Sequence, residues 1–392
     1  MKRTLIIECG AAATRAALTE GEEVVRFWFG PARGDEADDN EPRTGRRFAG
    51  RVKSINKGLA AAFVDIGDGR DAYLALNNKN EALVIDGALI GVAVKSPPRQ
   101  GKGAALKFLE DQTLDCETPG RLGPVEDAAI EAARSIGEGA DEIVVDDGAA
   151  VSALKAAAVT LAIRHETSPA ALFETYGAES ALDEAFERVV ALPGGGRVVI
   201  DEAQALTAID VDTGGLSAAS PQRLREKIAF AAADETARQI RLRNIGGQIV
   251  IDFPTISGDA ARKRFNEQLR KAMARIEGAG AFGFSKSGLY AFTAPHNAQS
   301  LLERFTEPAP FAPVSGRRFT LDWAAKSAMR ALEHRLRAHP QIRLRLETGS
   351  SLYAYINAHG LWTQRLNERY GARFDWIADE ALEERGFELA EQ

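Results

Sequence analysis

Two apolar stretches that each end in an aspartate constrain the fold of this chain more than any other feature. LTAID ends at Asp210 and QIVID ends at Asp252, with a long helical pattern between them. The two aspartates are 42 residues apart, which is enough for a strand–helix–strand crossover that makes the strands parallel. Both carboxylates would then lie at one carboxyl edge of the sheet, where α/β proteins bind ligands. Helix and strand patterns also alternate over residues 125–164, so we expect the α/β (α+β) class.

The residues around these strands predict where the neighbouring elements begin and end. Ser220 and Pro221 suit an N-cap and a first helical position, and we expect Gly246 and Gly247 to end that helix. Before it, RVVIDE and ALTAIDVDTGG predict a β-hairpin. After it, an amphipathic pattern predicts a helix over 259–276, and GFSKSGLYAF predicts one further strand with a glycine turn.

Asp210 and Asp252 have the chemistry of a metal site. Two neighbouring carboxylates repel each other, and a divalent cation relieves that repulsion. A metal held in this way can polarise a phosphoryl oxygen and generate a nucleophilic hydroxide. Asp212 follows Asp210 by two residues, so it projects from the same face of the strand and is a candidate third ligand or water-orienting group. The alternative, that all three acids cap helices or close turns, stays open from the sequence alone.

Composition narrows the choice of metal and of compartment. Cys9 and Cys116 are the 2 cysteines, and the 5 histidines are scattered, so we expect neither a zinc site nor a disulfide framework. Carboxylate ligands favour magnesium, or alternatively manganese. The apolar runs are too short for a transmembrane helix or a signal peptide. We therefore expect a cytoplasmic protein with no membrane partner.

Charge is unevenly distributed along the chain. The formal net charge of −7 is unusual for a generic nucleic-acid binder. Acidic residues dominate over 109–148, whereas basic residues dominate over 43–57 and 262–275. Local patches, and not the total charge, decide what a surface binds.

Residues 46–76 have the pattern of short adjacent strands with one polar, aromatic face. Alternation places Arg51 and Lys53 on the face opposite the apolar positions of FAGRVKSI, and it places Phe63 and Tyr73 opposite the apolar positions of their own strands. Such a surface can stack bases and neutralise phosphates. The alternative is that the two aromatic rings are core residues of a small barrel. Lys102, between two glycines in a later loop, could reach a phosphate.

Three segments resemble the ribonuclease E/G family. RRFAGRVKSINKGLAAAFVDIGDGRDAYLAL resembles the RNA-binding OB-fold of that family, the S1 motif. RVVIDEAQALTAIDVDTGG and ADETARQIRLRNIGGQIVIDF resemble its catalytic segments. The resemblance runs in order over most of the chain, is strongest from about residue 192 to 253, and is faint in the C-terminal segment.

The resemblance implies a multidomain arrangement, in which an OB-fold S1 domain is inserted in an RNase H-like portion and a DNase I-like catalytic portion follows. The expected boundaries are residues 1–40 and 108–196 for the RNase H-like portion, 41–107 for the OB-fold, 197–297 for the catalytic portion and 298–392 for a small C-terminal domain.

The same resemblance implies an endonuclease for single-stranded RNA that holds magnesium on Asp210 and Asp252. It also implies RNA contacts at Phe63, Tyr73 and Lys102. The pair of aspartates indicated by the strand pattern is thus the pair that the family implies.

The chain departs from the family pattern in three places. Asp212 stands where asparagine is usual, which adds a negative charge beside the metal. The stretch LLERFTEPAPFAPVSGRR lacks the cysteines of the family's zinc link, so a homo-oligomer would not be zinc-linked. No Arg-Thr pair for sensing a 5′-monophosphate occurs over residues 108–192.

Three functions follow from these patterns. The leading one is a magnesium-dependent endoribonuclease that cleaves single-stranded RNA in RNA processing or decay. The second is a non-catalytic RNA-binding protein on the same scaffold, because Asp212 and the missing sensor pair are departures at functional positions. The third is a metal-dependent phosphoesterase for small nucleotides, which would leave an RNA-binding face unexplained.

Overall fold

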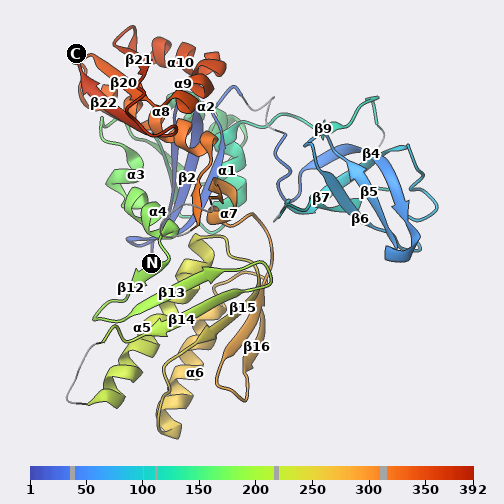
Figure 1. Cartoon of the computed structure of the whole chain (residues 1–392), viewed down its shortest axis with the longest axis vertical. Helices are drawn as coiled ribbons and strands as arrows, with labels where there is room; N and C mark the ends of the chain where they lie inside the picture. The colour runs from blue at the N-terminus through green and yellow to red at the C-terminus, as the bar shows by residue number, and fades with distance from the viewer. Residues whose placement is uncertain (36–39, 100, 111–113, 216–219, 310–315) are drawn as a thin grey trace. The chain divides into compact units, whose positions relative to one another are not determined.

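We describe a computed structural model of the chain, in which residues 1–35, 40–99, 101–110, 114–215, 220–309 and 316–392 are described (Figure 1). Residues 36–39 of the acidic stretch between the first strands and the barrel lie outside this description, as do residues 310–315 of the stretch that lacks the zinc-link cysteines. The chain divides into two compact units, each made of separate segments. Unit 1 comprises 1–39, 125–183 and 304–392, and unit 2 comprises 40–124 and 184–303.

Unit 1 is built on a sheet with the strand order β11-β10-β1-β2-β3. The first three strands form an antiparallel meander, and β1 pairs in parallel with β10, which follows the whole of the barrel in the sequence. The strands are β1 (Arg3–Cys9), β2 (Ala13–Glu20), β3 (Glu23–Pro31), β10 (Glu142–Val145) and β11 (Ala162–His165). The helices after the barrel are α1 (Ala128–Ile136), α2 (Gly148–Ala156), α3 (Leu172–Thr175) and α4 (Ala178–Phe186).

The C-terminal part of unit 1 has its own core beside this sheet, in which α8 packs with α9, α10 and a three-stranded sheet. Its elements are α7 (Leu301–Phe305), β18 (Thr306–Pro308), β19 (Arg317–Phe319), α8 (Leu321–Ala338), β20 (Leu344–Thr348), α9 (Ser350–Ala358), α10 (Gly360–Tyr370), β21 (Phe374–Ala378) and β22 (Phe387–Glu391).

Residues 47–108 form a closed barrel with the order β4-β5-β6-β8-β7 and a return to β4. Only the β6–β8 pairing is parallel, and this five-stranded closure is compatible with an OB-fold. The elements are β4 (Arg47–Asn56), the 3-10 helix η2 (Lys57–Leu59), β5 (Ala61–Asp65), β6 (Asp71–Ala75), β7 (Leu89–Ser96) and β8 (Ala105–Phe108), and β9 (Gly120–Leu122) adds to β4.

The second half of unit 2 is a six-stranded sheet in the order β12-β13-β14-β15-β17-β16, with helices α5 and α6 on one of its faces (Figure 1). The strands β14 and β15 are parallel, as the crossover predicts, and α5 connects them. The elements are β12 (Val189–Ala191), β13 (Arg197–Glu202), β14 (Thr207–Asp212), α5 (Pro221–Leu242), β15 (Gly247–Asp252), α6 (Asp259–Met273), β16 (Gly280–Phe284) and β17 (Tyr290–Ala294).

The expected start of α5 is confirmed, and its expected end is wrong. Ser220 is the N-cap, and its side chain accepts a hydrogen bond from the backbone N–H of Arg223. The helix ends at Leu242, because Asn244 adopts a left-handed conformation with φ 55°. Gly246 serves a different purpose: a Cβ there would lie 2.4 Å from Nδ1 of His296, so this glycine permits a close approach.

One further expectation about this sheet needs correction: GFSKSGLYAF forms two antiparallel strands, β16 and β17, instead of one. The strand β15, which contains QIVID, is exposed on one face, because both covering helices lie on the other face. Among the described residues, no helix is both long and apolar enough to cross a membrane.

Candidate functional site

Asp210 and Asp252 are direct neighbours across the parallel pair β14–β15. They are register partners, which places their Cα atoms on adjacent strands about 4.8 Å apart. Along β14 the buried residues Ile209 and Val211 alternate with exposed ones, and Asp210 belongs to the exposed set. Asp252, the last residue of β15, is exposed as well. Both side chains therefore project from the sheet face that α5 and α6 do not cover.

Neither of these two aspartate side chains makes a hydrogen bond or an ion pair with any described residue. The alternative in which they close turns or cap helices requires such partners, and none is present in the described part of the chain. Mg²⁺ is commonly bound by one or two carboxylates while it keeps several water ligands. Two adjacent, exposed and unpartnered carboxylates fit that description.

Asp212 lies on the same strand face, but its contacts differ. Its Oδ2 accepts hydrogen bonds from Nε of Arg197 at 2.9 Å and from Nη2 at 2.6 Å, and its Oδ1 accepts one from the backbone N–H of Gly214 at 3.0 Å. The Gly214 hydrogen bond and then the Arg197 guanidinium lower the pKa of this carboxyl. Among the described residues, no three acidic, histidine or cysteine side chains form a group that could hold a metal. The role of Asp212 as a third ligand stays a prediction.

The sequence pattern did not single out Arg197. Residues 203–206 connect the two strands of the β13–β14 hairpin, and its register puts Arg197 directly opposite Asp212. Counting back from this short connection would have paired the two residues from the sequence alone.

The barrel places two of its predicted RNA contacts side by side. Phe63 and Tyr73 are register partners on β5 and β6, and their rings meet edge to face with centroids 6.4 Å apart. Tyr73 is 40% exposed and Phe63 is half-buried, whereas Val64 and Leu74 beside them are buried in the barrel core. The alternative that both rings are core residues is therefore wrong.

The basic residues around this aromatic pair are held in different ways. Lys53 lies at a β-bulge in β4, and its Nζ is 2.7 Å from a carboxylate oxygen of Asp71. Arg51 donates hydrogen bonds to two backbone carbonyls, those of Gly87 and Glu117. Lys102 is exposed, and its side chain makes no hydrogen bond or ion pair with a described residue.

The loop that carries Lys102 is fixed against the start of β6. A Cβ at Gly103 would lie 2.1 Å from the carbonyl oxygen of Asp71, so only glycine fits there. Tyr73 follows in the same strand, and its backbone N–H donates to the carbonyl of Ala104. These contacts bring the loop to β6, the strand that bears Tyr73 of the aromatic pair.

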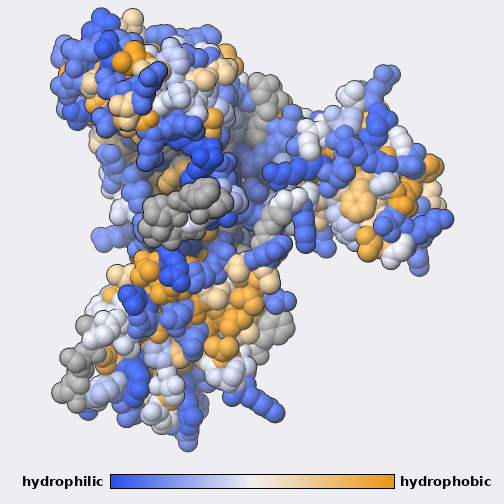
Figure 2. Space-filling view, viewed as in Figure 1, coloured by the Kyte–Doolittle hydropathy of each residue, from blue (hydrophilic) through white to orange (hydrophobic). Residues whose placement is uncertain are grey.

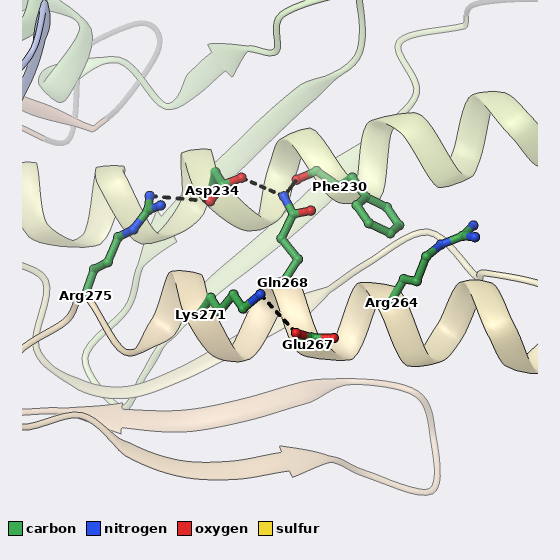
Figure 3. Close-up of a pocket in the computed structure, with 7 residues that line it drawn as sticks. All are labelled: Phe230, Asp234, Arg264, Glu267, Gln268, Lys271 and Arg275. Carbon is green, nitrogen blue, oxygen red and sulfur yellow. Dashed lines mark hydrogen bonds and ion pairs between the residues drawn. The ribbon is translucent and has the colours of Figure 1, made fainter. Parts of the chain in front are cut away.

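A groove between α5 and α6 is not a second candidate site (Figure 3). Its charged groups already pair with one another: Lys271 with Glu267, and Arg275 with Asp234. Gln268 donates hydrogen bonds to Asp234 and to the carbonyl of Phe230. The contacts of Arg275 and Gln268 join the two helices, and together with the Lys271–Glu267 pair they leave the groove without the unpartnered groups that a binding site needs.

Comparisons with known proteins identify one matching family and several similar proteins. The profile of the Ribonuclease E/G family matches residues 109–294. Ribonuclease E of Escherichia coli (strain K12) is 42% identical over 123 residues, which is 29% of this chain and 11% of that protein. Ribonuclease G of the same organism is 29% identical over 179 residues, which is 44% of this chain and 36% of that protein. Ribonuclease E of Haemophilus influenzae is 34% identical over 167 residues, or 41% of this chain and 18% of that protein.

The matched region contains β14 and β15, and with them both exposed aspartates. The chain spans 11% of the Escherichia coli Ribonuclease E and 36% of the Ribonuclease G that it matches. The resemblance to the ribonuclease E/G family is therefore confirmed, and residues 109–294 carry it.

Proposed function

We propose that this chain is a magnesium-dependent endoribonuclease that cleaves single-stranded RNA in RNA processing or decay. The observation that carries the proposal is the pair Asp210 and Asp252, adjacent on parallel strands, exposed and without partners among the described residues. Relatives named Ribonuclease E and Ribonuclease G support RNA as the substrate class.

The two aspartates would hold the metal, with manganese as an alternative to magnesium. When bound, such an ion supplies Lewis-acid chemistry and lowers the pKa of a bound water. Asp210 and Asp252 orient that site toward the open sheet face, where a phosphodiester can approach without displacing a helix. Figure 2 shows hydrophobic residues gathered on the surface over strands β13–β16, among polar ones.

Within the barrel, Phe63 and Tyr73 would stack on bases, and Lys53, Lys102 and Arg51 would neutralise phosphates.

Stacking of one base on an aromatic ring contributes about 1–3 kcal/mol. We therefore expect Phe63→Ala and Tyr73→Ala each to weaken binding of a single-stranded RNA roughly tenfold. A titration by fluorescence anisotropy checks this, with Phe108→Ala on β8 as the aromatic control outside the pair.

We further assign the domain arrangement in outline. The sheet of β1–β3 with β10 and β11, interrupted by the barrel, would be the RNase H-like portion, and the barrel would be the S1 domain. The sheet of β12–β17 with α5 and α6 would be the DNase I-like catalytic portion.

The test is a cleavage assay on end-labelled single-stranded RNA with Mg²⁺ or with EDTA. Loss of metal binding removes several kcal/mol of transition-state stabilisation, so Asp210→Asn and Asp252→Asn should each slow cleavage about 10³-fold or more. Asp201→Asn is the matched control, because Asp201 lies on the same sheet face but pairs with Arg188. Cleavage by both site variants at the wild-type rate would reject the proposal.

The same assay tests the second function. A non-catalytic RNA-binding protein would bind the labelled RNA equally well in EDTA and would cleave it with neither Mg²⁺ nor Mn²⁺. RNAs with 5′-hydroxyl, monophosphate and triphosphate ends show in addition whether the 5′ end is sensed.

A further inference from the structure

Arg197 and Asp212 form an ion pair on the sheet face that carries Asp210 and Asp252. The guanidinium contacts one carboxylate oxygen through two nitrogens, and the backbone of Gly214 contacts the other oxygen. Both oxygens of Asp212 are thus occupied, whereas those of Asp210 and Asp252 have no described partner. These three neighbouring aspartates therefore differ in their availability to a cation.

The pair lies close enough to influence the two open carboxylates. Arg197 is opposite Asp212, and Asp210 is two residues away along the same strand. Diagonal neighbours on one face of an antiparallel pair are about 7–8 Å apart, within reach of a long side chain. At this distance the charge of an unpaired Asp212 would act on any ion or phosphate at Asp210.

The pair is poorly placed to stabilise the fold. Its side chains are 50% and 34% exposed, and ion pairs on the surface contribute little to stability. The contacts are nevertheless geometrically well formed, and they neutralise the additional carboxylate of this face.

We propose that Arg197 is a positioning residue that neutralises Asp212, so that the neighbouring aspartates Asp210, Asp212 and Asp252 present the charge of only two. This inference rests on the proposed function. With one divalent cation bound, the four side chains and the ion carry no net charge, and a phosphodiester approaches without repulsion. Without Arg197, the same site would carry one negative charge and would repel the RNA that it cleaves.

The inference is tested on the full chain by Mn²⁺ titration, followed by isothermal calorimetry and by the electron paramagnetic resonance of the free ion. The variants are Arg197→Ala, Asp212→Asn and the double variant, with Arg188→Ala as control because Arg188 forms an exposed ion pair with Asp201 on β13. One added negative charge at about 6–8 Å should make Arg197→Ala bind Mn²⁺ about three- to tenfold more tightly.

Steady-state cleavage gives the second readout. Arg197→Ala should raise KM for single-stranded RNA by a similar factor, and the double variant should return both Mn²⁺ affinity and KM to wild-type values. Arg188→Ala should change neither. Melting temperatures within about 2 °C of wild type establish that the variants are folded.

The outcomes separate this inference from the function on which it rests. Unchanged Mn²⁺ affinity and KM in Arg197→Ala, with binding abolished in Asp210→Asn/Asp252→Asn, overturns the inference alone. A double variant that keeps a raised KM also overturns it, because Arg197 would then contact RNA directly. Mn²⁺ binding by Asp210→Asn/Asp252→Asn at wild-type affinity overturns the proposed function and the inference together.

Discussion

Two pairs of acids in this molecule stand at equivalent places in a sheet and have opposite surroundings. Glu8 and Asp146 lie at the carboxyl ends of the parallel pair β1–β10, and Asp210 and Asp252 lie near the carboxyl ends of the parallel pair β14–β15. The first pair is buried and fully engaged. The second is exposed and has no partner among the described residues. An acid at a strand end is therefore not evidence of a site until its partners are known.

The contacts of Glu8 show how a buried acid is accommodated. Arg15 donates to its Oε1 through Nε at 2.8 Å, and His334 Nε2 lies 3.1 Å from the same oxygen. Burial alone would raise the pKa of Glu8, but the Arg15 charge and the His334 hydrogen bond outweigh it and hold the pKa well below its usual range.

Asp146 is accommodated by different partners. It accepts a hydrogen bond from the backbone N–H of Cys9 and pairs with Arg337 at 2.9 Å. Burial and the nearby Glu8 charge nevertheless raise its pKa. The backbone N–H of Phe173 donates to Oε2 of Glu8. The partners of the first acid pair thus come from β1, β2, α3 and α8, so that pair joins elements of the fold and leaves no oxygen for a ligand.

The largest expected loss in the free energy of unfolding comes from breaking the buried ion pair between Glu8 and Arg15. Glu8→Gln leaves the buried Arg15 charge with Glu179 as its ion-pair partner in place of two carboxylates, and removing one member of a buried pair typically costs about 3–5 kcal/mol. We expect a loss of that size in the free energy of unfolding, measured in urea at pH 7. Asp210→Asn/Asp252→Asn without metal should lose nothing, because it relieves a repulsion. If both variants lost the same free energy of unfolding, the buried and the exposed acid pairs would not differ in their contribution to stability.

A smaller change in the stability of the folded protein is expected from the binding of Mg²⁺. At 100 times its dissociation constant, a ligand that binds only the folded state stabilises it by about 2.7 kcal/mol. Mg²⁺ should therefore raise the melting temperature of the wild type and of Glu8→Gln. It should leave Asp210→Asn/Asp252→Asn unchanged. A melting temperature that rises equally in all three proteins would place the metal elsewhere.

The smallest change in the free energy of unfolding is expected from lowering the pH. Because the pKa of Glu8 is lower in the folded than in the unfolded protein, the unfolded chain takes up the proton first. The stabilisation is complete above the usual glutamate pKa and is lost as pH falls below it. One proton gives at most about 1.4 kcal/mol per pH unit. Urea unfolding at pH 5 and pH 4 should show a steeper loss in wild type than in Glu8→Gln, and parallel losses would contradict the prediction.

The sequence predicted the position of the aspartate pair because crossover length and strand pattern are local properties. It did not predict that the strands are half exposed, since exposure depends on where α5 and α6 pack. The end of α5 was misplaced because Asn244 takes the left-handed conformation usually given to glycine.

Long-range pairing was the least predictable part of the molecule. The contact of Glu8 with His334 joins residues 326 positions apart, and no local pattern contains that information. The bulge at Lys53 was also missed: it shifts the register of β4, so simple alternation does not describe that residue's neighbours. Arg197 was recoverable in principle, because a hairpin fixes its partner by counting.

The parallel pairing of β1 with β10 has a consequence for the order of folding during synthesis. Strand β1 comprises Arg3–Cys9, yet its neighbour begins at Glu142, and the backbone N–H of Ala11 finds its acceptor on Glu333, 322 residues later. The barrel needs only the residues up to Phe108 to close. During synthesis β1 therefore leaves the ribosome long before the residues that complete its surroundings, so this sheet is completed later than the barrel.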